Sequence, residues 1–278
     1  MHNSNQLLTD FENHLRAEQL SPRTISTYLS LLKKYLNHFQ CKPKRISAKQ
    51  IIDYLAEIQS PVTRKQARAV IGKLHFMLGQ PRKMKGVPKP KQPQRVARYL
   101  NEAEIAQVLN ALSNLKHRAI LTLMYAGALR VSELLNLRVC DINGHNSTVK
   151  ICQSKGAKDR VVPLPPETLQ LLRSYYRAYR PGWYLFAGPN GKYSATSVNK
   201  VLASALNKCG LSGKITAHGL RHSRATHLIN QGVDVKIIKE FLGHRKIETT
   251  EKYLHCAVNN IADQIRQADS RITSKLLN

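Results

Sequence analysis

The chain has 278 residues, enough for two domains that each bury a core of their own. Lysine and arginine number 44 against 17 aspartates and glutamates, and the formal charge of +27 argues against a merely soluble basic protein without an anionic partner. This surplus is spread along the whole chain. Nucleic acid is therefore the first expected partner, and an anionic membrane is the second.

The cysteines and the apolar runs indicate a cytoplasmic protein. The five cysteines are far apart, with neither a disulfide framework nor paired zinc-ligand spacing. The amino terminus lacks the charged and apolar regions of a signal peptide. The most apolar run, 119–129, is too short to span a bilayer, so we expect a core helix there and no membrane partner.

The first domain is predicted to be a small helical bundle. Apolar residues recur at helical spacing in four segments between residue 6 and about residue 80. Ser21-Pro22 and Ser60-Pro61 are start signals, because each pairs a cap residue with proline at the first helical position. Ser47 caps the helix between them.

Basic residues gather on the last of these helices and in the segment that follows it. Arg64, Lys65 and Arg68 fall on one helix face, which either lies against DNA phosphates or is simply solvated. Residues 83–98 alternate prolines with lysines and arginines, which predicts an extended, semi-rigid linker. Such a strap suits a clamp around DNA, and a plain linker is equally compatible with the pattern.

The second domain is predicted to begin with a helix capped by Asn101 and Glu104. A buried helix at 118–125 then leads into a turn that contains Arg130. An unpaired charge between apolar segments is costly, so Arg130 needs a phosphate or a carboxylate. Glu133 is the structural alternative to a phosphate.

Two strands, 147–153 and 160–164, are predicted to form a hairpin whose tip carries Lys155 and Lys158. Such a tip can enter a DNA groove, although the hairpin alone favours solvent-exposed lysines. Further helices follow. The whole pattern predicts a mainly α fold with a small β-sheet (α+β).

The stretch 218–253 holds histidines, an arginine and a tyrosine between apolar segments. We interpret Tyr253 as a nucleophile and His218, Arg221 and His244 as groups that surround a phosphate. Two histidines four residues apart are spaced like zinc ligands on a helix. A glycine stands where a zinc peptidase needs its glutamate, so we expect no metal site.

Five elements occur in order along the second domain, with gaps that match a known pattern. These five elements are Ala128-Leu129-Arg130-Val131-Ser132-Glu133-Leu134, Lys155, His218-Gly219-Leu220-Arg221-His222, Leu242-Gly243-His244 and Tyr253. The first domain adds the motif Ser-Pro-Arg-Thr-Ile-Ser-Thr-Tyr. In these elements the chain resembles, over nearly its whole length, the tyrosine recombinases of the Xer and phage-integrase family. It departs from them at Ala128, where glycine is frequent, at Arg224, where an aromatic or apolar residue is frequent, and at Leu254, where threonine is common.

The resemblance implies an architecture. Residues 1–82 would form a helical, SAM-like core-binding domain that clamps DNA, and residues 83–98 the linker. Residues 99–278 would form the mixed catalytic domain, ending in a tail helix. That helix would dock onto a neighbouring subunit, although packing on its own domain remains an alternative.

The resemblance also implies a reaction without metal or other cofactor, in which DNA is cut and rejoined through a 3′-phosphotyrosine. Arg130 and Arg221 would bind the non-bridging oxygens. His218 would handle the proton of the nucleophile, and His244 would donate a hydrogen bond to the phosphate. Lys155 would protonate the leaving 5′ oxygen. The implied catalytic set is Arg130, Lys155, His218, Arg221, His244 and Tyr253.

The implied partner is double-stranded DNA with inverted-repeat core sites, bound by a tetramer in the synapse, with the state off DNA left open. Two other readings remain: a DNA-binding protein without chemistry, and an enzyme that relaxes supercoils as type IB topoisomerases do. The target sequence and the choice among dimer resolution, integration, excision and cassette exchange also stay open. The expected DNA contacts are Arg64, Lys65, Arg68, Lys89, Lys91, Arg95 and Lys158.

Overall fold

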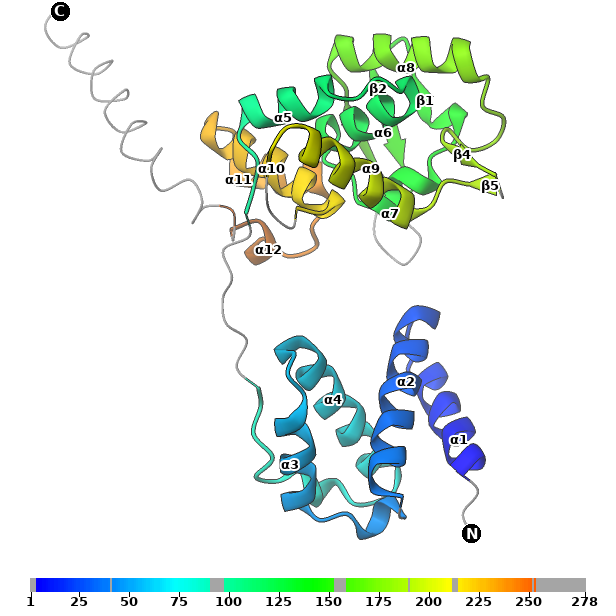
Figure 1. The fold of residues 1–278 in the computed structure, drawn as a ribbon, viewed down its shortest axis with the longest axis vertical. Helices are drawn as coiled ribbons and strands as arrows, with labels where there is room; N and C mark the ends of the chain where they lie inside the picture. The colour runs from blue at the N-terminus through cyan, green and yellow to red at the C-terminus, as the bar shows by residue number, and fades with distance from the viewer. Residues whose placement is uncertain are drawn as a thin grey trace, which may run out of the picture. The chain divides into compact units, whose positions relative to one another are not determined.

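The chain forms two compact units, residues 1–95 and 96–278 (Figure 1). Both are mainly helical, and only the second contains sheets among the residues that the structure describes. None of the helices described is long and apolar enough to cross a membrane. This computed structural model describes residues 4–40, 42–90, 98–152, 159–189, 191–211, 215–251 and 253.

The first unit packs its helices around one apolar core, in which Phe11, Leu32 and Tyr35 are fully buried. The predicted helix starts are confirmed, because Ser21, Ser47 and Ser60 each accept a hydrogen bond from a backbone N–H three residues on. The elements of this unit are α1 (Ser4–Ala17), α2 (Pro22–Phe39), η1 (Pro43–Arg45), α3 (Ala48–Glu57), α4 (Pro61–Met77) and η2 (Pro81–Met84).

The chain after α4 stays attached to the first unit for several residues. Val87 is buried in the core of this unit, and Arg68 donates two hydrogen bonds to its carbonyl oxygen. Lys83 donates to the carbonyl oxygens of Lys44 and Ile46. The residues directly after η2 are therefore part of the bundle rather than a free spacer.

The second unit surrounds a larger core with helices, one three-stranded antiparallel sheet of order β1-β2-β3 and one two-stranded antiparallel sheet (Figure 1). Asn101 and Glu104 form the predicted capping box at its first helix. Its elements are α5 (Glu102–Asn110), α6 (Leu115–Ala126), α7 (Val131–Asn136), η3 (Val139–Asp141), β1 (Ile142–Asn143), β2 (Thr148–Ile151), β3 (Arg160–Pro163), α8 (Pro166–Tyr179), β4 (Ala187–Gly188), β5 (Gly191–Lys192), α9 (Ala195–Lys208), α10 (Ala217–Asn230), α11 (Val235–Leu242) and α12 (Glu248–Glu251).

The predicted hairpin is confirmed as β2 and β3, which pair with Val149 opposite Val162, both buried in the core. The strands β1, β4 and β5 were not predicted. Each has two residues, too few for an alternation of apolar and polar side chains to show. The predicted class, mainly α with a small β-sheet, is correct.

Candidate active site

The carboxyl end of α11 gathers three guanidinium groups. Its consecutive carbonyl oxygens at Phe241, Leu242 and Gly243 accept hydrogen bonds from Arg160 (2.9 Å), Arg221 (2.6 Å) and Arg130 (3.2 Å) respectively. The last carbonyls of a helix have no partner within it and carry partial negative charge. These arginines satisfy the carbonyls, and each comes from a different element of the second unit.

Arg221, on α10, is completely buried. Besides Leu242, it donates to the carbonyl oxygen of Ala128 over 2.8 Å. Among the residues described, its Nε atom has no hydrogen-bond partner. Burial and the neighbouring Arg130 lower the pKa of Arg221, but a guanidinium stays charged at neutral pH.

The turn before Arg130 has left-handed backbone geometry at Ala128, where φ is +46°. This region costs a residue with a Cβ atom roughly 1–2 kcal/mol, which gives a physical reason for glycine being frequent at this place in the resembling family. In this turn the Ala128 carbonyl oxygen accepts a hydrogen bond from Arg221, and Arg130 becomes the N-cap residue of α7. The departure at Ala128 thus leaves the turn in place.

Arg130 has the carboxylate partner that its position requires. Its Nη1 lies 2.5 Å from Glu133 Oε1, and its backbone N–H donates to Glu133 Oε2 over 2.9 Å. The Arg130 side chain remains 35% exposed, so part of the guanidinium faces outward. Arg130 can therefore bind the Glu133 carboxylate and a phosphate at the same time, so the two hypotheses about its partner are compatible.

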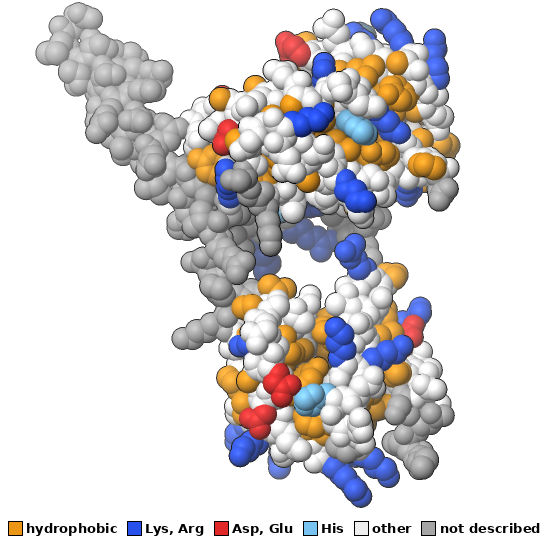
Figure 2. All heavy atoms as spheres, viewed as in Figure 1, with side chains coloured by type: hydrophobic (Ala, Val, Ile, Leu, Met, Phe, Trp, Pro, Cys, Tyr) orange, Lys and Arg blue, Asp and Glu red, His pale blue; other side chains and the backbone are white. Residues whose placement is uncertain are grey.

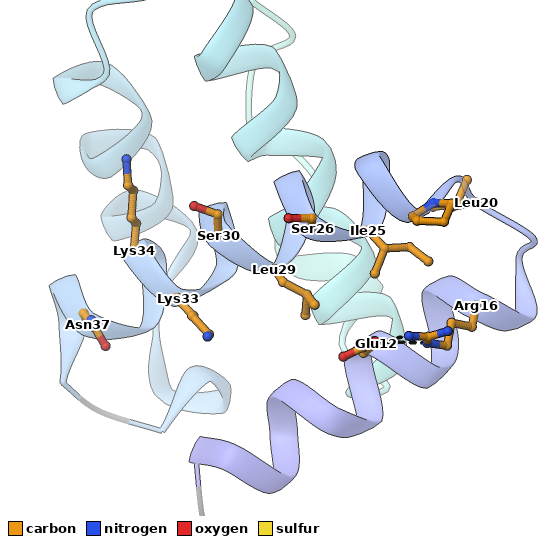
Figure 3. Close-up of a pocket in the computed structure, with 11 residues that line it drawn as sticks. Glu12, Arg16, Leu20, Ile25, Ser26, Leu29, Ser30, Lys33, Lys34 and Asn37 are labelled. Atoms are coloured by element: carbon orange, nitrogen blue, oxygen red, sulfur yellow. Dashed lines mark hydrogen bonds and ion pairs between the residues drawn. The ribbon is translucent and has the colours of Figure 1, made fainter. Parts of the chain in front are cut away.

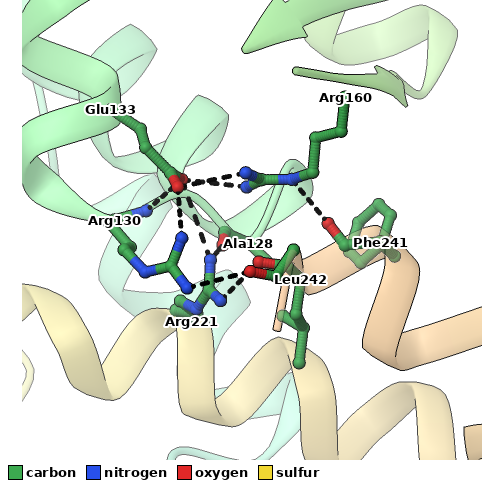
Figure 4. A network of polar contacts seen from close by, with 8 residues as sticks. Ala128, Arg130, Glu133, Arg160, Arg221, Phe241 and Leu242 are labelled. Atoms are coloured by element: carbon green, nitrogen blue, oxygen red, sulfur yellow. Dashed lines mark hydrogen bonds and ion pairs between the residues drawn. The ribbon is translucent and has the colours of Figure 1, made fainter. Parts of the chain in front are cut away.

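Glu133 lies at the centre of the arginines, as Figure 4 shows. Arg160 binds both of its oxygens, over 3.0 and 2.8 Å, and Arg221 Nη1 lies 3.7 Å away. Burial by itself would raise the pKa of the Glu133 carboxyl, but the hydrogen bonds and charges of Arg160 and Arg130 lower it to about 2. Glu133 is ionised at neutral pH, and the cluster of one carboxylate and three guanidiniums keeps a surplus of two positive charges.

Two histidines face this positive cluster. His244 follows the α11 terminus directly, and its Nδ1 lies 2.8 Å from Thr250 Oγ1. Burial and then Arg221, Arg130 and Arg160 lower the pKa of His244 to about 4. Desolvation and the same charges of Arg221 and Arg130 also lower the pKa of His218, on the first turn of α10.

In the free protein, the His244 imidazole is therefore expected to titrate near pH 4. The charged form is disfavoured in the fold, so the ring is neutral at pH 7, and the negative charge of a DNA phosphate should raise its pKa. NMR of ring-labelled histidine, assigned with His244→Gln, measures both values. A midpoint between pH 6 and 7 without DNA would contradict the expectation.

Tyr253 is 6% exposed and packs with Ala128, Ile238 and Leu242. Its ring centroid lies 6.3 Å from that of His244, with the planes inclined by 13°. The charge of its phenolate form acts on Arg221, which places the phenol within the electrostatic reach of the cluster. The apolar contacts hold the ring, so its position depends on the packing of α10 and α11.

Most of the predicted catalytic residues thus lie around one end of α11. Lys155 lies outside the described residues, as do the predicted DNA contacts Lys91, Arg95 and Lys158. The residues found near the α11 terminus or in electrostatic contact with its arginines are Arg130, His218, Arg221, His244 and Tyr253.

The predicted contacts of the first unit divide into two kinds. Arg64 donates to the carbonyl oxygens of Ala56 and Ile58 at the end of α3, and Arg68 is bound to Val87, so both hold the bundle together. Lys65 and Lys89 are exposed. Only these two are free of a structural hydrogen bond among the predicted DNA contacts that the structure describes.

The sequence reading did not single out a groove between α1 and α2, shown in Figure 3. This groove has a volume of about 740 Å³, and Lys33 and Lys34 line it together with Ser26 and Ser30 of α2. An ion pair between Glu12 and Arg16, 2.6 Å long, lines it from α1. None of the predicted catalytic residues lines this groove.

Arg160 and His222 were also missed as parts of the site. Arg160 reads as an ordinary strand residue, and nothing in its neighbours indicates that it reaches Glu133. His222, one turn beyond His218, is buried with its ring centroid 4.8 Å from that of Tyr253. Its spacing from His218 suggested only a zinc pair. The described residues contain no group of three or more histidines, cysteines or carboxylates arranged to hold a metal.

Comparison with known proteins follows the division into two units. The phage integrase family matches residues 98–260, and the phage integrase N-terminal SAM-like domain matches residues 7–76. The first match spans more than half of the chain. Both matches fall within single units of the structure.

Relatives match the chain almost from end to end. A putative integrase/recombinase of Sinorhizobium fredii is 33% identical over 256 residues, which cover 89% of this chain and 83% of that protein. The tyrosine recombinase XerA of Pyrococcus horikoshii is 30% identical over 274 residues, covering 95% and 94%. The fold is similar to that of the XerH site-specific recombinase bound to palindromic difH substrate, with a TM-score of 0.78 at 22% identity, covering 95% and 84%. The chain belongs to the phage integrase family and is a tyrosine recombinase, an enzyme that breaks and rejoins DNA at specific sites.

Proposed function

We propose that the Tyr253 hydroxyl attacks the scissile phosphate of a DNA core site. The tyrosine O–P bond forms as the bond from phosphorus to the 5′ oxygen breaks, which leaves the 3′ phosphate on Tyr253. His218 takes the phenol proton, and Lys155 gives a proton to the leaving 5′ oxygen. The reverse attack by the 5′ hydroxyl of another strand rejoins the DNA, and no external energy source is required because one phosphoester replaces another.

The observation that carries this proposal is the gathering of Arg130, Arg221 and His244 around one helix end beside Tyr253. A phosphodiester carries one negative charge, and its five-coordinate transition state carries a second. The surplus of two positive charges in the cluster matches the doubly charged transition state better than the singly charged phosphodiester. Catalysis by preorganised charge requires this preference for the transition state. The histidines are neutral before the reaction, so they add no charge to the cluster in the ground state.

His244 can donate to a phosphate oxygen in its neutral form. When Nδ1 accepts the hydroxyl hydrogen of Thr250, Nε2 keeps the N–H that a phosphate oxygen needs. Arg221 offers a further donor, because its Nε atom has no partner among the described residues. Both groups are held by the protein before DNA arrives, which lowers the cost of ordering them during the reaction.

The substrate in this proposal is duplex DNA with inverted-repeat core sites, joined in a synapse by a tetramer of the chain. Related proteins supply the precedent: XerH is bound to a palindromic substrate, and a lambda integrase tetramer is bound to a Holliday junction. The formal charge of +27 supplies non-specific attraction to phosphates. We also propose that the protein acts on its DNA sites in the cytoplasm.

Basic surfaces of both units would contact the DNA. Figure 2 shows lysines and arginines on the visible face of each unit, with few acidic side chains between them. In the first unit, Lys65 and the groove that holds Lys33 and Lys34 are the candidates. In the second unit, the hairpin tip with Lys158 is the candidate that the sequence indicates.

A suicide substrate tests the proposed function. A nick placed just 3′ to the scissile phosphate lets a short fragment diffuse away after cleavage, which traps the covalent product. The expected result is a protein–DNA species that survives denaturant and carries the 3′ phosphate. A chain that only binds DNA would give none, and relaxed plasmid without recombinant product would indicate a topoisomerase.

A further inference from the structure

Arg160 is the arginine of the cluster that the proposed chemistry does not use. It is the first residue of β3, pairs with Ile151 across the hairpin, and keeps 9% of its side chain exposed. Its Nη1 and Nη2 bind the two oxygens of Glu133, and its Nε donates to the carbonyl oxygen of Phe241 (Figure 4). All three nitrogens of the guanidinium are therefore engaged within the protein.

These contacts join the hairpin, α7 and α11. Glu133 lies on α7, for which Arg130 is the N-cap residue, and Phe241 lies on the last turn of α11, three residues before His244. Arg160 thus braces the two elements that present Arg130 and His244. Because only 9% of its side chain is exposed and its three nitrogens are already bound, Arg160 is not placed to bind a phosphate. Any effect on the reaction must therefore pass through its neighbours.

Glu133 is the neighbour that matters most, because it competes with the substrate. A buried carboxylate and a DNA phosphate both need the donors of Arg130 and Arg221. The fork of Arg160 takes both carboxylate oxygens. Arg130 also binds Glu133, through Nη1 over 2.5 Å, and keeps its Nη2 on the Gly243 carbonyl, whereas Arg221 remains 3.7 Å from the carboxylate. Without Arg160, the carboxylate would hold Arg130 more strongly and would draw Arg221 inward. The positive surplus of the cluster would also fall from two charges to one.

We propose that Arg160 is a positioning residue for strand cleavage: it neutralises Glu133 so that Arg221, and the charge of Arg130, which also binds this carboxylate, stay available to the scissile phosphate. This proposal rests on the proposed function. With Arg160 present, Glu133 is a structural anchor. Without Arg160, Glu133 would oppose the stabilisation of the negative charge that develops at the scissile phosphate during cleavage. The effect should grow with the negative charge that the reacting phosphate carries.

The test compares two substrates. One is the suicide duplex with an ordinary scissile phosphate, and the other has a methylphosphonate there, which lacks one negative charge. Single-turnover rates of adduct formation are measured for the wild type, Arg160→Gln and Arg160→Lys, with DNA affinity measured separately. Arg173→Gln, on the exposed side of α8, is the matched control.

Arg160→Gln is expected to cleave the phosphodiester roughly 10–100-fold more slowly than the wild type, the usual cost of removing a group that orients reacting groups from outside. DNA affinity should stay the same. On the methylphosphonate the deficit should shrink, because less charge has to be matched. Arg160→Lys keeps the positive charge but lacks the planar guanidinium, so its cleavage rate should lie between those of the wild type and Arg160→Gln. Arg173→Gln should cleave both substrates at the wild-type rate.

Equal deficits on both substrates would reduce Arg160 to a purely structural role, and no deficit on the phosphodiester would also overturn the proposal. Should Arg160→Gln fail to fold, Arg160→Lys decides through the same comparison of substrates. The double variant Arg160→Gln with Glu133→Gln adds an independent check, since loss of the competing carboxylate should make the Arg160 substitution nearly neutral. A wild type that forms no adduct refutes the proposed function instead.

Discussion

Replacing Tyr253 with phenylalanine is expected to abolish the covalent protein–DNA adduct while leaving DNA binding intact. The substitution removes only the hydroxyl oxygen, which is the atom that forms the bond to phosphorus. The loss of a nucleophile in covalent catalysis costs on the order of 10⁴-fold or more, so the adduct should fall below detection. Adduct formation on the suicide substrate and DNA affinity by titration measure the two effects.

The ring contacts of Tyr253 make this a clean substitution. Phenylalanine keeps the packing against Ile238 and Leu242 and the ring contacts with His222 and His244. Tyr179→Phe, at a side chain 45% exposed on α8, is the control that should cleave normally. An adduct that persists in Tyr253→Phe, or a DNA-linked peptide from another tyrosine, would show that the nucleophile has been misassigned.

Replacing Arg221 with lysine is expected to slow cleavage roughly 10²–10³-fold and to destabilise the second unit. Lysine keeps the charge but lacks the planar fork, so it cannot serve Ala128, Leu242 and a phosphate together. A buried carbonyl left without its donor costs about 1–3 kcal/mol. Single-turnover cleavage and urea denaturation separate the two losses.

Arg224→Lys is the matched control for this experiment. Arg224 lies one turn further along α10, is half-buried, and has its guanidinium 5.4 Å from the centre of the Tyr125 ring. A lysine at this position keeps a positive charge near the Tyr125 ring, so Arg224→Lys should cleave DNA at close to the wild-type rate. Wild-type cleavage by Arg221→Lys would mean that a single point charge is enough at this position.

The local signals in the sequence translated directly into structure. Serine caps, the Asn101 capping box and the β2–β3 hairpin are confirmed, because each depends on residues three to fifteen positions apart. The predicted cluster around the phosphate was based on residue types that occur in a particular order along the chain. The structure brings five of its six members to one region. The sixth, Lys155, remains a prediction.

The assignment of basic residues to DNA was less secure, and Arg68 shows why. A charged face on a helix gives no indication of whether a side chain points to solvent or back to the chain. Arg64 and Arg68 reach carbonyl oxygens six and nineteen residues away, contacts that no helical periodicity encodes. Lys33 and Lys34 were overlooked because the groove beside them exists only once α1 packs on α2.

The sequence by itself determined the helical and strand segments, the basic character of the chain and the order of the chemically active residues. Only the tertiary structure decided that three consecutive carbonyls at the end of α11 hold Arg160, Arg221 and Arg130, and that one buried carboxylate, Glu133, is shared among them. The physical reason is range. Caps and turns form between near neighbours, whereas a buried charge must find its partners wherever packing places them, here up to 113 residues apart.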